Sequence, residues 1–166
     1  MPRLEFQINI AAPCERVFDL ARSIDLHKAS MASHHEEAIA GVTSGLIGPG
    51  ETVTWRARQF GLPVRLTSRI TVFDPPHRFA DAMVSGPFKS FSHEHVFERT
   101  SGGTVMRDVF DYRSPLGLLG RLADWLFLER HMKKLLAARN AIIKQVAEST
   151  EWPKYLAAAD GSHGDV

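Results

Sequence analysis

The sequence predicts an α+β domain in which a curved antiparallel sheet of about seven strands wraps around one long C-terminal helix. Apolar and polar residues alternate with a period of two along residues 3–10 and through most of residues 51–113, which indicates half-buried strands. From Pro115 the apolar residues recur every three or four positions, which indicates a helix. Because the strands and the long helix occupy separate parts of the chain, the pattern favours α+β over alternating α/β architecture.

The first 50 residues predict one strand, two short helices and one weak strand. Residues 3–10 alternate strictly between polar and apolar side chains, as a strand with one buried face does. Pro13 then opens a short helix, because a proline in the first turn loses no hydrogen bond. A second short helix is expected in IDLHKASM, which starts at residue 24, and residues 33–50 are expected to hold the weak strand.

The middle of the chain predicts a meander of antiparallel strands. Strands over residues 53–57 and 64–72 flank the turn FGLP. The prolines of DPP, at 74–76, interrupt the sheet because proline cannot donate a hydrogen bond to a neighbouring strand. A strand over 78–84 precedes the turn SGP, and residues 86–112 are expected to end in a hairpin closed at the glycines of RTSGG.

The last regular element is expected to be an amphipathic helix that starts at Pro115. About 30 residues at 1.5 Å each would span roughly 45 Å, the full length of the domain. We expect a single domain over residues 1–149 and a disordered tail over 150–166. Because one helix cannot fill the concave side of a twisted sheet, a cavity between the two is expected.

Composition narrows the classes of function. The 20 basic and 19 acidic residues give a net charge of +1, which argues against a nucleic-acid partner. The single cysteine, Cys14, excludes an internal disulfide and a thiolate-rich metal cluster. No apolar run approaches the roughly 20 residues that span a bilayer, and none at the N-terminus resembles a signal peptide. We therefore expect a cytoplasmic protein without a membrane span.

Four segments resemble those of a known superfamily: GETVTWRARQFG, FADAMVSGPFKSFSHEHVFE, GTVMRDVFDYRSPLG and LLAARNAIIK. The sequence is identified as a member of the SRPBCC or START-like superfamily, which includes birch-pollen-allergen-like proteins, lipid-transfer domains and polyketide cyclases. It also resembles a bacterial ligand-binding SRPBCC subgroup related to polyketide cyclase/dehydrase-type proteins. The resemblance covers residues 3 to about 147 and implies the helix-grip fold, which hosts binders, transporters and enzymes alike.

Two histidines of FSHEHVF stand on a strand face where apolar residues are expected. Alternate residues of a strand share one face, so both histidines point inward with the flanking phenylalanines. If the turn pairs Phe97 with Thr104, then His93 lies opposite Asp108. A similar register across the preceding turn places Asp81 near His93. The expected result is an Asp–His–Asp ladder across three strands.

Three interpretations of this ladder stay open. It can be a hydrogen-bonded network that satisfies buried groups and lines the pocket. It can transfer protons, with His93 and either Asp108 or Asp81 acting as general base on an enolisable ligand, as the resemblance to polyketide cyclases suggests. It can also bind zinc or non-haem iron, although no spacing such as HExxH supports this. We expect neither a metal nor a cofactor.

The most favoured function is reversible binding of a hydrophobic or amphipathic small molecule, such as a lipid, isoprenoid, quinone or polyketide-like compound. One alternative is a cofactor-independent cyclase, dehydratase or isomerase that uses His93 and Asp108. Another is an interaction protein acting through residues 118–128, an apolar surface that can also form a homodimer. The residues expected to bind the ligand are Trp55, Phe79, Asp81, Met83, Phe91, His93, His95, Phe97, Met106, Asp108, Phe110, Tyr112 and Leu122.

Overall fold

The computed structural model describes residues 3–32, 36–59, 61–113 and 127–156. Strands and helices follow one another in the predicted order. The short helices begin where the sequence indicates, with Pro13 at the N-cap of the first and the Ser23 hydroxyl capping the second. The elements are β1 (Arg3–Ile10), α1 (Cys14–Ala21), α2 (Ile24–Ser30), β2 (Glu37–Gly41), β3 (Thr52–Gln59), β4 (Leu62–Asp74), β5 (Arg78–Ser85), β6 (Ser90–Thr100), β7 (Gly103–Arg113), α4 (Glu129–Glu148) and α5 (Pro153–Leu156).

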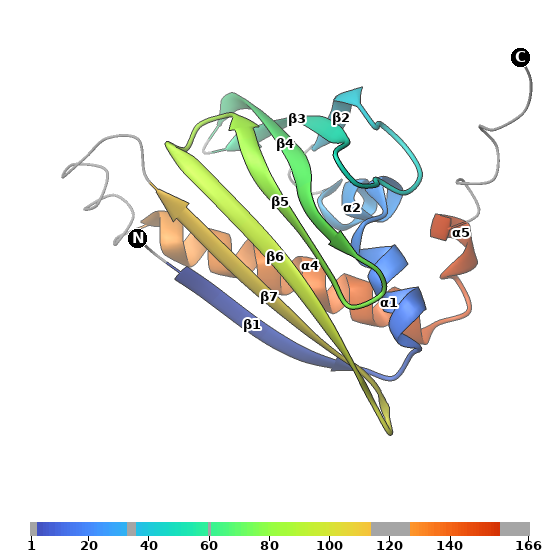
Figure 1. Cartoon of the computed structure of the whole chain (residues 1–166). Coiled ribbons are helices and arrows are strands. Elements are labelled where there is room, and N and C mark those ends of the chain that lie inside the picture. Colours follow the sequence, from blue (N-terminus) through green and yellow to red (C-terminus); the bar gives the residue numbers. More distant parts are fainter. Residues whose placement is uncertain (1–2, 33–35, 60, 114–126, 157–166) are drawn as a thin grey trace, which may run out of the picture.

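The strands form one curved antiparallel sheet in the order β1-β7-β6-β5-β4-β3-β2 (Figure 1). Each strand from β2 to β7 pairs with its neighbour in sequence, and β1 closes the sheet beside β7. The long helix and the two short helices after β1 complete the architecture. The predicted α+β class and helix-grip fold are confirmed.

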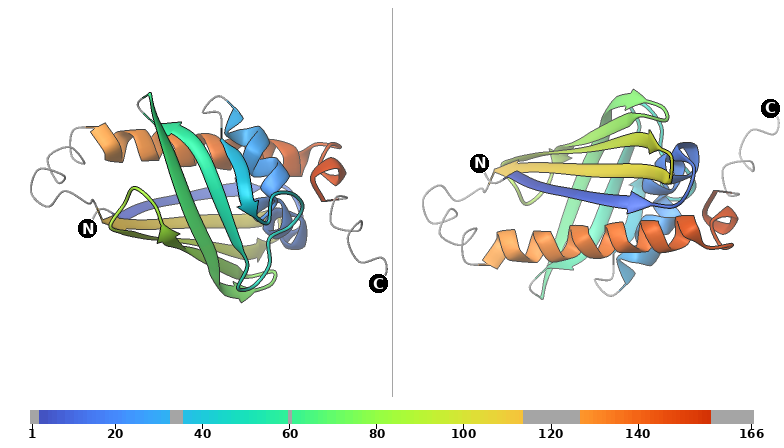
Figure 2. Two further views of the ribbon diagram at one scale, coloured as in Figure 1. Left: turned by 90° about the horizontal axis from the view of Figure 1, so that it is seen from above. Right: turned by 90° about the horizontal axis from the view of Figure 1, so that it is seen from below.

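Helix α4 lies along one face of the sheet, toward the edge formed by β1 (Figure 2). Among the described residues its main contacts are with β1, α1 and α2. The predicted start of this helix at Pro115 lies outside the described residues, and its described part begins at Glu129. None of the described helices combines the length and the apolar character needed to cross a bilayer.

The chain after α4 differs from the disordered tail expected from residue 150. Residues 153–156 form α5, and the side chains of Trp152, Tyr155 and Leu156 are partly buried against the core. The guanidinium of Arg16 lies over the Trp152 ring, 4.3 Å from its centroid. These apolar side chains pack the segment against the core. The polar residues between them break up the apolar pattern in the sequence, so the helix was not predicted. The division into one domain over 1–149 stays a prediction.

The buried apolar residues form two clusters. In the main core, α1 and the end of α4 pack on the sheet, and the ring of Phe18 meets those of Phe79 and Phe97 edge-on at 5.5 Å. The second core lies at the other end of the sheet and consists of Leu4, Phe91, Phe110, Tyr112 and Leu136. Apolar packing therefore joins α4 to the rest of the fold in both clusters.

Strands β6 and β7 pair in a register that differs by two residues from the predicted one. His95 lies opposite Asp108, whereas the prediction placed His93 there; His93 instead lies opposite Phe110. A shift by two keeps every side chain on its predicted face, because the side-chain period of a strand is two. Across β5 and β6 the prediction was right, since Asp81 lies opposite His93.

The position of the turn explains the error. Phe97 pairs with Met106 rather than with Thr104, and the strands stay paired up to Thr100 and Gly103, with only two residues between them. The predicted pairing centres the turn between Thr100 and Ser101, one residue before its observed centre between Ser101 and Gly102. Two-residue loops suit antiparallel hairpins because their twist matches that of the strands they join.

A substitution at Gly103 tests the geometry of this turn. The φ of Gly103, +133°, is rarely adopted by other residues, and an added Cβ would lie 2.2 Å from the carbonyl oxygen of Ile10. We expect Gly103→Ala to lower the free energy of unfolding by about 2 kcal/mol or more. Gly102→Ala is the matched control, since its Cβ would meet nothing within 4 Å. Urea unfolding measures both, and equal losses would contradict the turn geometry.

Candidate functional site

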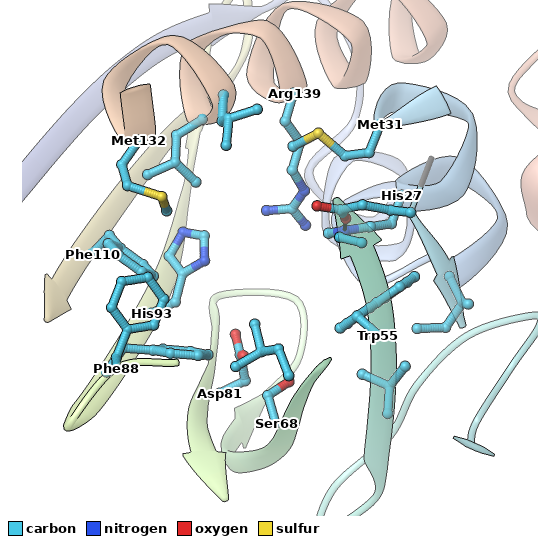
Figure 3. A pocket seen from close by; sticks show the side chains of 18 of the residues that line it. His27, Met31, Trp55, Ser68, Asp81, Phe88, His93, Phe110, Met132 and Arg139 are labelled. Atoms are coloured by element: carbon cyan, nitrogen blue, oxygen red, sulfur yellow. Dashed lines mark hydrogen bonds and ion pairs between the residues drawn. The ribbon is translucent and has the colours of Figure 1, made fainter. Parts of the chain in front are cut away.

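A cavity of about 670 Å³ lies between the sheet and α4 (Figure 3). Strands β3 to β7 and helices α1, α2 and α4 all contribute to its walls. Most of the lining side chains are apolar, among them Trp55, Ile70, Phe79 and Leu136. The polar side chains in the lining are Arg22, Ser23, His27, Glu36, Ser68, Asp81, His93, His95 and Arg139.

The predicted ligand-binding residues divide into three groups. Those that line the cavity are Trp55, Phe79, Asp81, Phe91, His93, His95 and Phe110. Those that lie outside the lining are Met83, Phe97, Met106, Asp108 and Tyr112, the last four of which are fully buried behind the cavity walls. Leu122 lies outside the described residues. Whether any of them contacts a ligand stays a prediction.

Asp108, on β7, is 0% exposed and lies between the two histidines of β6. The Nδ1 atom of His95 is 2.5 Å from Oδ1 of Asp108, and Nε2 of His93 is 3.9 Å from Oδ2. With a carboxylate at Nδ1, a neutral imidazole carries its proton on that nitrogen, which leaves the lone pair on Nε2. The ring of Phe79 stacks on His95 at 4.4 Å and supports the plane of the imidazole.

His93 and Asp81 lie side by side on the cavity wall. Figure 3 shows the ring of His93 pointing into the cavity from β6, with Asp81 on the neighbouring strand. The ring contacts those of His95, at 4.1 Å, and Phe110, at 5.3 Å. Asp81 forms neither a hydrogen bond nor an ion pair with its side chain within the described ranges. Both residues therefore offer polar atoms to the cavity.

Burial controls the charge state of the His95–Asp108 pair. Desolvation lowers the pKa of His95 to about 4, although the carboxylate of Asp108 opposes the shift. Burial alone would raise the pKa of Asp108, but the two imidazoles beside it hold that pKa well below its usual range. At neutral pH the pair is a carboxylate that accepts a hydrogen bond from a neutral imidazole.

The cavity holds a second histidine–carboxylate pair, which was not predicted from the sequence. Nε2 of His27, on α2, is 2.9 Å from Oε2 of Glu36, and the His27 ring stacks on Trp55 at 4.2 Å. Burial lowers the pKa of His27, and the hydrogen bond to Glu36 opposes this. The two residues are nine positions apart and meet only because α2 packs against β2, which directly follows Glu36, so no local spacing signals the pair.

Arg139 was also missing from the predicted set. It lies on α4, is 7% exposed, and donates a hydrogen bond from Nη2 to the carbonyl of Ala21 at 2.8 Å. Its guanidinium points into the cavity (Figure 3), and no described carboxylate forms an ion pair with it. A charged residue among the apolar positions of an amphipathic helix was the available signal.

Apolar side chains also line the cavity where it meets the surface. Leu62 is 67% exposed and Phe127 66% exposed, yet both belong to the lining. Phe88 and Leu128 line the cavity beside them. The entrance is therefore bounded by the β3–β4 turn, the β5–β6 connection and the start of α4. Of the predicted surface 118–128, only residues 127 and 128 are described, and both line the cavity.

Comparison with known families now identifies the chain. The model of the family described as "Polyketide cyclase / dehydrase and lipid transport" matches residues 1–148. The chain belongs to this family. The match confirms the SRPBCC superfamily predicted from the sequence. No curated protein sequence matches the chain significantly.

Solved structures show the same fold for this member of the polyketide cyclase/dehydrase and lipid transport family. The protein TTHA0849 from Thermus thermophilus is 20% identical, with a TM-score of 0.71 over 96% of this chain and 100% of that one. The ginseng major latex-like protein 151 from Panax ginseng is 16% identical, with a TM-score of 0.62 over 88% and 97%. Ara h 8.0201 is 14% identical, with a TM-score of 0.56 over 86% and 97%.

The buried, neutral His95 should make the protein less stable in mild acid. Since its pKa falls from 6.5 to about 4 on folding, the unfolded chain binds the proton more readily below pH 6.5. The free energy of unfolding should drop by about 2 kcal/mol between pH 7 and pH 5 through this residue. His95→Gln keeps a donor for Asp108 but cannot titrate, so we expect a smaller drop in urea unfolding at the two pH values.

Comparing the two proteins isolates His95, because His27 and the other histidines are present in both. An equal drop in wild type and His95→Gln would show that His95 is not held neutral in the folded state.

Proposed function

We propose that this protein reversibly binds a hydrophobic or amphipathic small molecule, such as a lipid, isoprenoid, quinone or polyketide-like compound. The observation that carries the proposal is the cavity of about 670 Å³ with predominantly apolar walls. Ligand pockets typically measure about 300–1,000 Å³ and are mostly apolar, with a few polar groups that fix orientation. The family description, which names polyketide cyclases, dehydrases and lipid transport, supports the same class of ligand.

The apolar wall supplies the affinity. A ligand that loses about 300 Å² of apolar surface to the cavity gains roughly 7 kcal/mol, at about 25 cal/mol per Å², before the cost of association. Trp55, Phe79, Phe91 and Phe110 are the large aromatic side chains that this surface would contact. The exposed apolar side chains at the entrance give such a molecule a route from solvent to the interior.

The polar side chains of the cavity supply orientation. His93, Asp81 and Arg139 have polar atoms that face the cavity and are incompletely paired within the described protein. A buried polar group without a partner is unfavourable, so a ligand with a matching hydroxyl, carbonyl or acidic group gains from pairing with it. This favours an amphipathic ligand over a plain hydrocarbon.

Two alternative functions, an enzyme and an interaction protein, differ from reversible binding in what they require of the cavity. A cyclase, dehydratase or isomerase would chemically change the bound molecule, so turnover separates it from a binder. An interaction protein whose interior is filled by side chains would not need a cavity of this volume. The homodimer through residues 118–128 and the cytoplasmic location stay predictions.

A bulky side chain placed inside the cavity should weaken ligand binding. Ser68 lines the cavity from β4, and Arg69 beside it is exposed on the opposite face of the sheet. We expect Ser68→Phe to weaken binding of an environment-sensitive apolar dye at least about tenfold, because the ring occupies ligand space, whereas Arg69→Phe adds the same bulk outside. Wild type should bind about one dye per chain in a fluorescence titration.

Equal dye affinities in Ser68→Phe, Arg69→Phe and wild type would contradict binding in the cavity. Native mass spectrometry of protein purified from its own source then identifies the chemical class of any retained ligand. Incubation of that ligand with the protein separates binding from turnover, since an enzyme changes the mass or the chromatographic retention of the molecule.

A further inference from the structure

Three side chains with metal-binding atoms converge on one wall of the cavity. Asp81, His93 and His95 each offer one ligand atom, and these atoms all lie within 4.8 Å of one another. Both histidines are buried, and Asp81 is partly buried. We propose that these three residues bind one divalent first-row transition metal ion, of the zinc, cobalt or iron type.

The sheet places the three side chains together. His93 and His95 are two residues apart on β6 and so project from the same face of the strand. Asp81 is directly opposite His93 on β5. Two imidazoles from one strand and a carboxylate from its neighbour are therefore held by main-chain hydrogen bonds of the sheet. In tetrahedral zinc sites the ligand atoms lie about 2.0–2.2 Å from the ion and therefore about 3.4 Å from one another, which is within the spread of up to 4.8 Å seen here.

Asp108 supports the site from behind. Histidines that bind metals usually donate their other ring N–H to a carboxylate or carbonyl, which fixes the tautomer and the ring orientation. The contact of 2.5 Å between His95 Nδ1 and Asp108 has this form and leaves Nε2 as the ligand atom.

The charges around the cavity favour a cation. Asp81 and Glu36 line it, and Asp108 lies directly behind its wall. Of the two lining arginines, Arg22 forms an ion pair with Asp19, which leaves Arg139 as the cationic group of the described lining without such a pair. Two carboxylates of the described lining and one behind the wall thus stand against one unpaired guanidinium, and a divalent ion compensates the difference.

The donor set also indicates which metals fit. Imidazole nitrogens with one carboxylate suit zinc, iron and cobalt, whereas magnesium and calcium prefer oxygen ligands. Three protein ligands leave a coordination position open, as in catalytic zinc sites. Because the three residues line the cavity, that position would accept an oxygen atom of the bound molecule. No motif with metal-ligand spacing is present in the sequence, since the third ligand comes from another strand.

Cobalt binding tests the proposal with the full chain, prepared without an affinity tag of histidines and stripped with a chelator. Titration with Co²⁺ by calorimetry and visible absorption should show one site per chain in wild type, with Zn²⁺ as competitor. Asp81→Asn and His93→Gln should each reduce binding to the level that the remaining histidines of the chain give. Asp108→Asn should weaken binding about 10- to 100-fold, as loss of a supporting carboxylate does.

Glu36→Gln is the matched control, because it removes a negative charge from the same cavity without removing a ligand atom, and it should weaken Co²⁺ binding much less than Asp81→Asn does. Circular dichroism shows that each variant is folded, and dye binding by the metal-free protein reports on the cavity separately. Wild-type binding no stronger than that of Asp81→Asn and His93→Gln would overturn the proposal. An equal loss in Glu36→Gln would also overturn it, since the ion would then respond only to the charge of the cavity.

Discussion

The structure depends on a mismatch in width between the sheet and the helix that covers it. Seven strands about 4.8 Å apart make a surface roughly 30 Å wide, whereas an α-helix with its side chains is about 10–12 Å across. Helix α4 packs toward the edge formed by β1, and α1 and α2 cover the sheet near the end of α4. The concave surface that no helix reaches becomes the wall of the cavity, so this fold creates a binding space without any specialised segment.

The two apolar clusters make this arrangement stable. The main core, around Phe18 and Ile143, and the second core, around Tyr112 and Leu136, hold α4 against the sheet at both ends. The cavity between them needs little packing of its own, and its lining can carry polar groups at positions where a closed core would be apolar. Each such group still needs a partner or access to the cavity. His95 has its partner in Asp108, and His27 has Glu36.

The sequence was sufficient to predict the sheet, the order of its elements and the inward face of β6, because strand and helix periods are local properties. The superfamily followed from local segments as well. The pairing of His27 with Glu36 and the direction of Arg139 were not predictable, since they depend on how α2 packs against β2 and how α4 packs against α1. Trp152 and its neighbours were placed in a tail because a short apolar segment shows no period.

The register of the β6–β7 hairpin shows how one turn determines the chemistry of the site. A slip by one residue would turn both histidines to the solvent face, and a slip by two keeps them inside but exchanges their partners. With a turn of two residues, Asp108 lies opposite His95, which it orients through Nδ1. His93 lies opposite Phe110 and keeps its ring directed into the cavity beside Asp81. A turn centred one residue earlier would place Asp108 opposite His93 instead, and His95 opposite Met106.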